Sequence, residues 1–179
     1  AGRSVACHTV ARCPVALAHS RGRMSRRPAP ELPTPPPTNA EPSRSGGAPL
    51  GGFVDLPLGE QPLTLMSLSP DSPGVTVGTA QGVVKRVTTD YPGNKDDWEI
   101  ISLKGRDEVV GAVELRTGDE DVVFVTPDAH LLHFPPSSVR PQGRTAAGLA
   151  GLTLAPGAPA AFFGPLAPPR TPLPVTPPR

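Results

Sequence analysis

The chain has 179 residues, enough for one ordinary domain, and a formal net charge of +1 that by itself selects no class of partner. Nine of its 27 prolines lie in residues 1–49 and seven in residues 165–179. Proline lacks a backbone donor, and these ends hold few large apolar side chains, so we predict disordered Pro-rich tails at both ends. No stretch is long and apolar enough to cross a membrane, which argues against a membrane partner.

We expect residues 50–164 to be ordered, because short apolar segments alternate there with turn-forming residues. Residues 63–68 alternate and predict a strand, followed by a proline- and glycine-rich turn. Residues 75–79 and 83–88 predict two strands of a hairpin whose turn contains Gln81 and Gly82. Further strands are expected at residues 99–103, 108–115, 122–126, 131–134, 149–154 and 158–163.

The strands expected at residues 122–126 and 131–134 form a second hairpin, which repeats the hairpin at residues 75–88. Val-Thr-Val-Gly-Thr-Ala-Gln-Gly-Val-Val-Lys-Arg-Val begins at Val75, and Val-Val-Phe-Val-Thr-Pro-Asp-Ala-His-Leu-Leu-His-Phe begins 47 residues later at Val122. A period of roughly 20–50 residues is typical of arrays and propellers. The sequence therefore predicts an all-β fold of two four-stranded propeller-like blades, about 63–115 and 116–163. Pro159 confines the closing strand to a sheet edge.

Charge is divided between the tail and this middle segment. Residues 1–49 hold seven arginines against Glu31 and Glu41, whereas residues 50–164 hold eight basic and fourteen acidic residues. A basic tail favours polyanions in general. In the acidic middle, any nucleic-acid contact must come from local basic spots.

The two cysteines, Cys7 and Cys13, lie near His8 and His19. Their spacing matches no common zinc pattern, so we predict reduced thiols and no metal site. The arginine-rich start is compatible with an organelle transit peptide. Met24 offers a second possible start, which would place the first 23 residues in a translated upstream region.

Four fragments together resemble a known family. Gly-Thr-Ala-Gln-Gly-Val-Val-Lys-Arg (78–86), Ile-Ser-Leu-Lys-Gly-Arg-Asp-Glu-Val-Val-Gly (101–111) and Asp-Glu-Asp-Val-Val-Phe-Val-Thr-Pro-Asp (119–128) precede Val-Arg-Pro-Gln-Gly-Arg-Thr-Ala-Ala-Gly-Leu-Ala-Gly (139–151). In this order and spacing they are similar to the C-terminal β-pinwheel of the A subunit of bacterial type IIA DNA topoisomerases, gyrase and topoisomerase IV. The resemblance covers about 100 residues, or two blades.

The resemblance implies a DNA-binding fragment that helps to hold and bend a duplex during ATP-dependent changes of DNA topology. It implies as partners double-stranded DNA, the rest of the A subunit and the ATPase B subunit, in the bacterial cytoplasm at the nucleoid. ATP and Mg would belong to other domains, with no cofactor in this chain. No catalytic residue is expected, because Tyr91, the only tyrosine, lies in a polar loop rather than a catalytic segment. Both unrelated ends suggest a truncated or relic reading frame.

The expected DNA contacts follow from phosphate neutralisation by exposed cations. The candidates are Lys85, Arg86, Arg140, Gln142 and Arg144. Lys85 and Arg86 are adjacent on a strand, so only one can lie on a given surface. Gly143 and Gly148 would let backbone N–H groups approach a phosphate.

Several residues are interpreted as structural. His130 and His133 lack further ligands at metal spacing, and Trp98 is expected to pack against its blade. The alternative hypothesis for the whole chain is a non-catalytic or decayed β-repeat protein that binds another protein or nothing.

Overall fold

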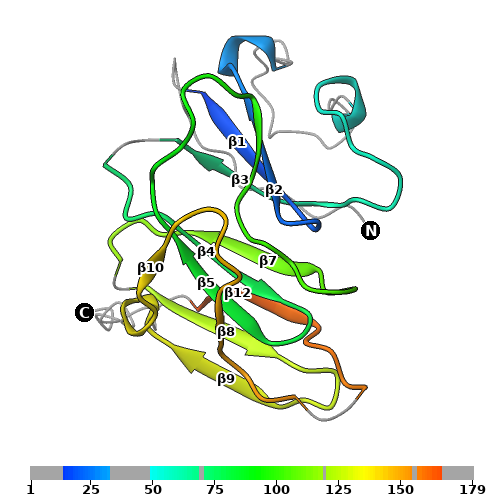
Figure 1. Cartoon of the computed structure of the whole chain (residues 1–179), viewed down its shortest axis with the longest axis vertical. Helices are drawn as coiled ribbons and strands as arrows, with labels where there is room; N and C mark the ends of the chain where they lie inside the picture. Colours follow the sequence, from blue (N-terminus) through cyan, green and yellow to red (C-terminus); the bar gives the residue numbers. More distant parts are fainter. Residues whose placement is uncertain (1–13, 33–48, 69–70, 119, 155–156, 167–179) are drawn as a thin grey trace, which may run out of the picture.

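A computed structural model describes residues 14–32, 49–68, 71–118, 120–154 and 157–166 (Figure 1). These residues contain β-strands, turns and three short 3₁₀ helices, η1 (Ala29–Glu31), η3 (Leu50–Gly52) and η4 (Pro136–Ser138). The all-β prediction is confirmed. Within the described ranges, no helix has the length and apolar character needed to span a bilayer.

The described strands form three sheets, where the sequence predicts two four-stranded units. The first sheet has the order β3 (Pro62–Ser67), β1 (Val15–His19), β2 (Arg23–Arg27) and β6 (Asp97–Glu99). The second has the order β10 (Pro141–Gln142), β5 (Val83–Val87), β4 (Val75–Thr79) and β7 (Val109–Glu114), with β11 (Leu149–Ala150) also on β5. The third has the order β12 (Phe162–Leu166), β8 (Asp121–Val125) and β9 (Leu131–Phe134).

Each sheet contains one hairpin of consecutive strands, β1–β2, β4–β5 or β8–β9, and the three hairpins share one register. Val15 pairs with Arg27, Val75 with Val87 and Val122 with Phe134. The turns are closed by the same hydrogen bond, and each then places one residue at positive φ: Gly22 (74°), Gly82 (77°) and Ala129 (65°). This geometry is typical of three-residue hairpin loops. The repeat therefore has a third copy, residues 15–27, which the sequence pattern did not reveal.

The chain returns after a hairpin to pair with the hairpin before it. β6 follows the β4–β5 hairpin and pairs with β2, whereas β10 follows the β8–β9 hairpin and pairs with β5. Figure 1 shows the first sheet in the upper part of the molecule and the other two below it. Consecutive sheets are thus joined by exchanged strands as well as by packing.

The second sheet lies between two apolar cores. On one side Val75, Val77 and Val87 pack with Met24 and Met66 of the first sheet. The other core joins side chains of the second and third sheets: Val84, Val113, Val122, Phe124 and Phe163. Alternation along β4 and β5 explains this, because successive side chains point to opposite faces. Trp98 belongs to the first core, as expected.

The prediction of a disordered segment over residues 1–49 is wrong for residues 15–27. Val15, Ala16, Leu17, Ala18 and Met24 are buried, and β1 is paired on both sides. The high proline and arginine content of residues 1–49 led to this error, because it outweighed a short hairpin that pairs with β3 and β6. Residues 1–13, with Cys7 and Cys13, and residues 33–48 lie outside the described part.

The predicted blade boundaries do not follow the sheets. β3 and β6, placed in a blade over 63–115, belong to the first sheet, and β10 and β11, placed in a blade over 116–163, belong to the second. β12 extends to Leu166 and so enters the tail predicted to be disordered from residue 165. Pro165 is tolerated there because β12 is an edge strand. Residues 167–179 lie outside the described part.

Candidate nucleic-acid interface

The strand pairing brings the five predicted site residues together. β10 runs parallel to β5, with Pro141 opposite Arg86 and Gln142 opposite Val87. Thr88 N–H donates to Gln142 O at 3.1 Å. Residues 143–148, called here the glycine loop, then leave β5 and return in β11, where Leu149 pairs with Val84. Lys85, Arg86, Arg140, Gln142 and Arg144 therefore lie on or beside one edge of the second sheet.

Lys85 is not an exposed phosphate contact, and that prediction is wrong. Its side chain is fully buried, and Nζ donates to the carbonyl oxygens of Ile100 (2.8 Å), Arg144 (2.7 Å) and Ala146 (2.7 Å). Burial lowers the pKa of Lys85 to about 8, while Glu99 raises it. The lysine is therefore mainly an ammonium at neutral pH, and its three donors face three carbonyls.

Three arginines remain at this edge and are called here the arginine edge: Arg86, Arg140 and Arg144. Arg140 is exposed, and Arg86 and Arg144 are half-buried. Arg86 Nη2 donates to Pro73 O at 3.4 Å, a long bond. Lys85 and Arg86 are adjacent on β5, and only Lys85 is fully buried. Such an edge can neutralise phosphates through long flexible cations.

Gln142 contributes mainly through its backbone, which pairs with β5. Its side-chain Oε1 and the Nε of Arg86 are both buried, and neither has a hydrogen-bond partner among the described residues. A buried polar atom in this state is usually satisfied by ordered water. The side chain of Gln142 is therefore only partly available to a ligand.

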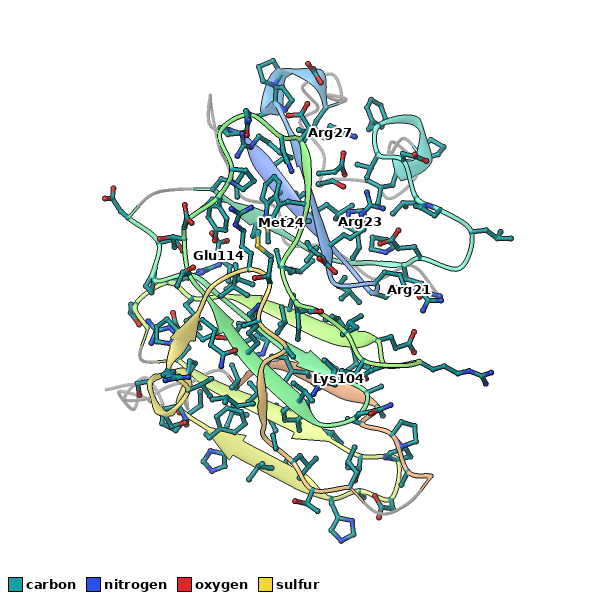
Figure 2. All side chains as sticks on the ribbon, viewed as in Figure 1. Arg21, Arg23, Met24, Arg27, Lys104 and Glu114 are labelled. Atoms are coloured by element: carbon teal, nitrogen blue, oxygen red, sulfur yellow. The ribbon has the colours of Figure 1, made fainter. Side chains whose placement is uncertain are left out.

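The arginines of the first hairpin are mostly engaged within the protein. Arg26 donates to Pro92 O at 2.5 Å and lies 5.2 Å above the Trp98 ring, and Arg27 donates to Phe53 O at 2.7 Å. Arg23 contacts Glu60 and Asp97. Figure 2 shows Arg21, which is exposed, at the tip of the hairpin. The described part of the basic segment thus offers fewer free cations than its composition implies.

A buried polar network in the first sheet was not foreseen. His19 Nε2 lies 2.8 Å from Ser25 Oγ, Glu60 Oε1 lies 3.5 Å from His19 Nδ1, and Ser25 donates to Asp97. The order acid, histidine, serine resembles that of a hydrolase. His19 and Ser25 are completely buried, so no substrate reaches the serine hydroxyl. The network holds β6 against the β1–β2 hairpin.

The histidines of the third sheet lie beside carboxylates. His130 Nδ1 lies 2.8 Å from Asp128 and His133 Nδ1 3.6 Å from Asp121, all at the surface of the third sheet. The described ranges contain no group of three or more potential ligands that could hold a metal ion.

Comparison with known proteins gives matches in sequence and in structure. The chain is 35% identical over 119 residues to the A subunit of DNA gyrase from Staphylococcus epidermidis and 34% identical over 119 residues to that from Staphylococcus aureus. These matches cover 64% of this chain and 13% of the gyrase proteins, so the chain spans a small part of those relatives. No protein-family model matches.

Solved structures agree with the sequence matches. The C-terminal domain of DNA topoisomerase IV aligns with a TM-score of 0.72 and 21% identity, covering 87% of this chain and 48% of that domain. The DNA gyrase A C-terminal domain aligns with a TM-score of 0.62 and 19% identity, covering 86% of this chain and 47% of that domain. The E. coli ParC C-terminal domain aligns with a TM-score of 0.61 and 21% identity, covering 86% of this chain and 62% of that domain.

The fold is that of the C-terminal β-pinwheel domains of type IIA topoisomerases. Over 64% of its length the chain is similar to part of the DNA gyrase A protein, and the resemblance inferred from residues 78–151 is confirmed.

Proposed function

We propose that this chain is a duplex-binding part of a type IIA topoisomerase, from its A-type polypeptide, and that the arginine edge contacts DNA phosphates. The observation that carries the proposal is that Arg86, Arg140 and Arg144 lie on or within two residues of the β5–β10 pair. Phosphate contacts of this kind position a duplex without reading its sequence. Binding should therefore be insensitive to sequence and strongly weakened by salt.

In the whole enzyme, this module would help to bend a duplex during ATP-dependent changes of DNA topology. Its partners would be the ATPase B subunit and the rest of the A subunit, in the bacterial cytoplasm at the nucleoid. ATP and Mg would act on other domains, and the residues of this chain would carry no chemical step. Bending a short duplex costs on the order of 1–10 kcal/mol, which a few arginines offset only in part.

The first prediction concerns DNA affinity and its salt dependence. The full chain should bind a short duplex at low salt, and the double variant R140E/R144E should lose most of that affinity. Each lost phosphate contact lowers the slope of log K against log salt by about 0.9, so the slope should fall by about 2. Fluorescence anisotropy over a salt series measures both quantities.

The matched control is R106E/R116E, which makes the same charge change at two exposed arginines of turns outside the arginine edge. The control should retain most of the affinity and nearly the same slope. An equal loss in both double variants would show a general charge effect and contradict the assignment of the edge. Absence of binding by the unaltered chain at low salt would favour the protein-interaction alternative.

A further inference from the structure

The second hairpin strands carry an equivalent residue that contacts the segment returning from the next repeat. Ser25, Lys85 and Leu132 occupy this position in the three hairpins, as the shared register shows. Ser25 donates to Asp97 of β6, which pairs with β2. Lys85 donates to the glycine loop, which follows β10 on β5. The same position thus ties consecutive repeats together in the first and second sheets.

At Lys85 the hydrogen-bonding capacity of the ammonium is completely used. Two of its acceptors, Arg144 O and Ala146 O, belong to the glycine loop, and the third, Ile100 O, belongs to the connection after β6. All three bonds are 2.7–2.8 Å long, which is typical of charge-assisted hydrogen bonds. One side chain therefore joins two segments that are distant in sequence.

The glycine loop is held at its ends by β10 and β11 on β5 and by the close approach of Gly148 to Val83 and Val84, and it has few contacts between them. None of residues 143–148 is fully buried, so the loop is not anchored by a buried apolar side chain. Ser102 N–H donates to Ala146 O at a longer 3.3 Å. Residues 147–150 line a hollow of about 250 Å³ with residues 101–104, which leaves that side loosely supported. Hydrogen bonds to Lys85 are thus the main attachment of the middle of the loop, residues 144–146, to the sheet.

We propose that Lys85 is a positioning residue for the arginine edge: its ammonium fixes the glycine loop and thereby sets where Arg144 lies relative to Arg86 and Arg140. The inference rests on the proposed DNA contact for its functional meaning, but its structural part can be tested without DNA. Lys85 itself touches no phosphate, because it is fully buried.

The first test measures the loop by hydrogen exchange in the full chain. In K85M an unbranched side chain one atom shorter is kept and the three donors are lost. The amides of Ala146 and Ser102 should exchange about tenfold faster or more, since they belong to the loop attachment. K95M is the matched control, because Lys95 is an exposed lysine on the connection before β6. Unchanged exchange at Ala146 and Ser102 in K85M would overturn the proposal.

The second test separates positioning from general destabilisation by a double-mutant cycle on DNA affinity. K85M should weaken binding several-fold in the unaltered chain and have almost no effect in the R140E/R144E background. An equal loss in both backgrounds would overturn the positioning role. If the unaltered chain binds no DNA, the proposed function fails, and the exchange experiment still decides whether Lys85 holds the loop.

If K85M does not fold, the unaltered chain supplies the test by NMR of lysine ammonium groups. The Lys85 ammonium protons should exchange with solvent far more slowly than those of the exposed Lys95 and Lys104. Their exchange rate should change in parallel with that of the Ala146 amide when the temperature is raised. Lys85 protons that exchange as fast as those of the exposed lysines would overturn the proposal.

Discussion

His19 occupies a hairpin position where the other two repeats carry threonine. Thr79 and Thr126 each use their hydroxyl to accept a backbone N–H of their own hairpin, from Val83 and His130. His19 instead contacts Ser25 and Glu60 in a buried network. The chain has thus replaced a local turn contact by one that joins the hairpin to other segments.

Burial lowers the pKa of His19 below its usual value of 6.5, against the opposing effects of Glu60 and Asp97. Arg23 and Arg27 act in the same direction as burial. Below pH 6.5 the unfolded chain therefore takes up a proton before the folded chain does. Folding stability should fall as the pH is lowered from 6.5 towards the folded pKa.

The second prediction concerns this fall in stability at low pH. Urea unfolding at several pH values should show that H19T flattens the dependence of the unfolding free energy between pH 5 and 6.5, because the titrating group is gone. The comparison is with the unaltered chain, measured in the same buffers at each pH. An H19T slope equal to that of the unaltered chain would contradict the assignment to His19.

Lys85 and Arg86 show how far sequence reasoning reaches at this scale. Strand alternation predicted that they point to opposite faces, and only Lys85 is fully buried. It did not tell which face was buried, because the acceptors for Lys85 come from segments 15, 59 and 61 residues away. A buried lysine saturated by distant carbonyls has no local signature.

Among the elements, the hairpins are the unit that the sequence specifies most directly. Apolar strand residues and the Gln81-Gly82 turn predicted the β4–β5 hairpin, and the repeat of that pattern predicted the β8–β9 hairpin. The β1–β2 hairpin has the same register but was missed, because arginines and flanking prolines dominate its composition. Composition was therefore a misleading guide to order in this segment.

The third prediction concerns the turn of the β8–β9 hairpin. Ala129 has φ 65°, where the equivalent residues of the other two hairpins are glycine. The left-handed conformation costs a non-glycine residue roughly 1–2 kcal/mol. Glycine avoids this cost, but its larger conformational entropy in the unfolded chain offsets part of the gain. A129G should therefore raise the unfolding free energy by about 0.5–1 kcal/mol in urea melts.

The matched control for the turn is A80G, in the β4–β5 turn, where Ala80 is not at positive φ. This variant should be neutral or destabilising, because no strain is relieved and chain entropy increases. Stabilisation by A80G equal to that by A129G would show that the gain does not come from the left-handed position.

At the scale of the whole molecule, glycines decide how closely the second and third sheets approach. A Cβ built on Gly111 would lie 1.9 Å from Phe163 O, and one on Gly78 would lie 2.3 Å from Phe163 Cγ. Phe163 also packs on Phe124, with ring centroids 4.6 Å apart. The position of β12 against β4 and β7 therefore depends on the absence of side chains at these two sites.

The fourth prediction follows from this contact. G111A should lower the unfolding free energy by about 2–3 kcal/mol, since backbone at Phe163 must move to admit a methyl group. G93A is the control, because a Cβ at Gly93 would meet nothing within 4 Å. Thermal or urea unfolding compares the two, and a G111A chain as stable as G93A would refute this account of the sheet packing.

Local sequence determined the all-β class, two of the three hairpins with their strand alternation, and the resemblance to the pinwheel of type IIA topoisomerases. These depend on turn conformation and side-chain alternation, which neighbouring residues fix. Only the tertiary structure decided that β3, β6 and β10 complete hairpins far from them in sequence, that residues 15–27 are ordered, and that Lys85 is buried. Such pairings depend on which apolar faces pack together and on which distant carbonyls need donors, and neither is encoded within a short window.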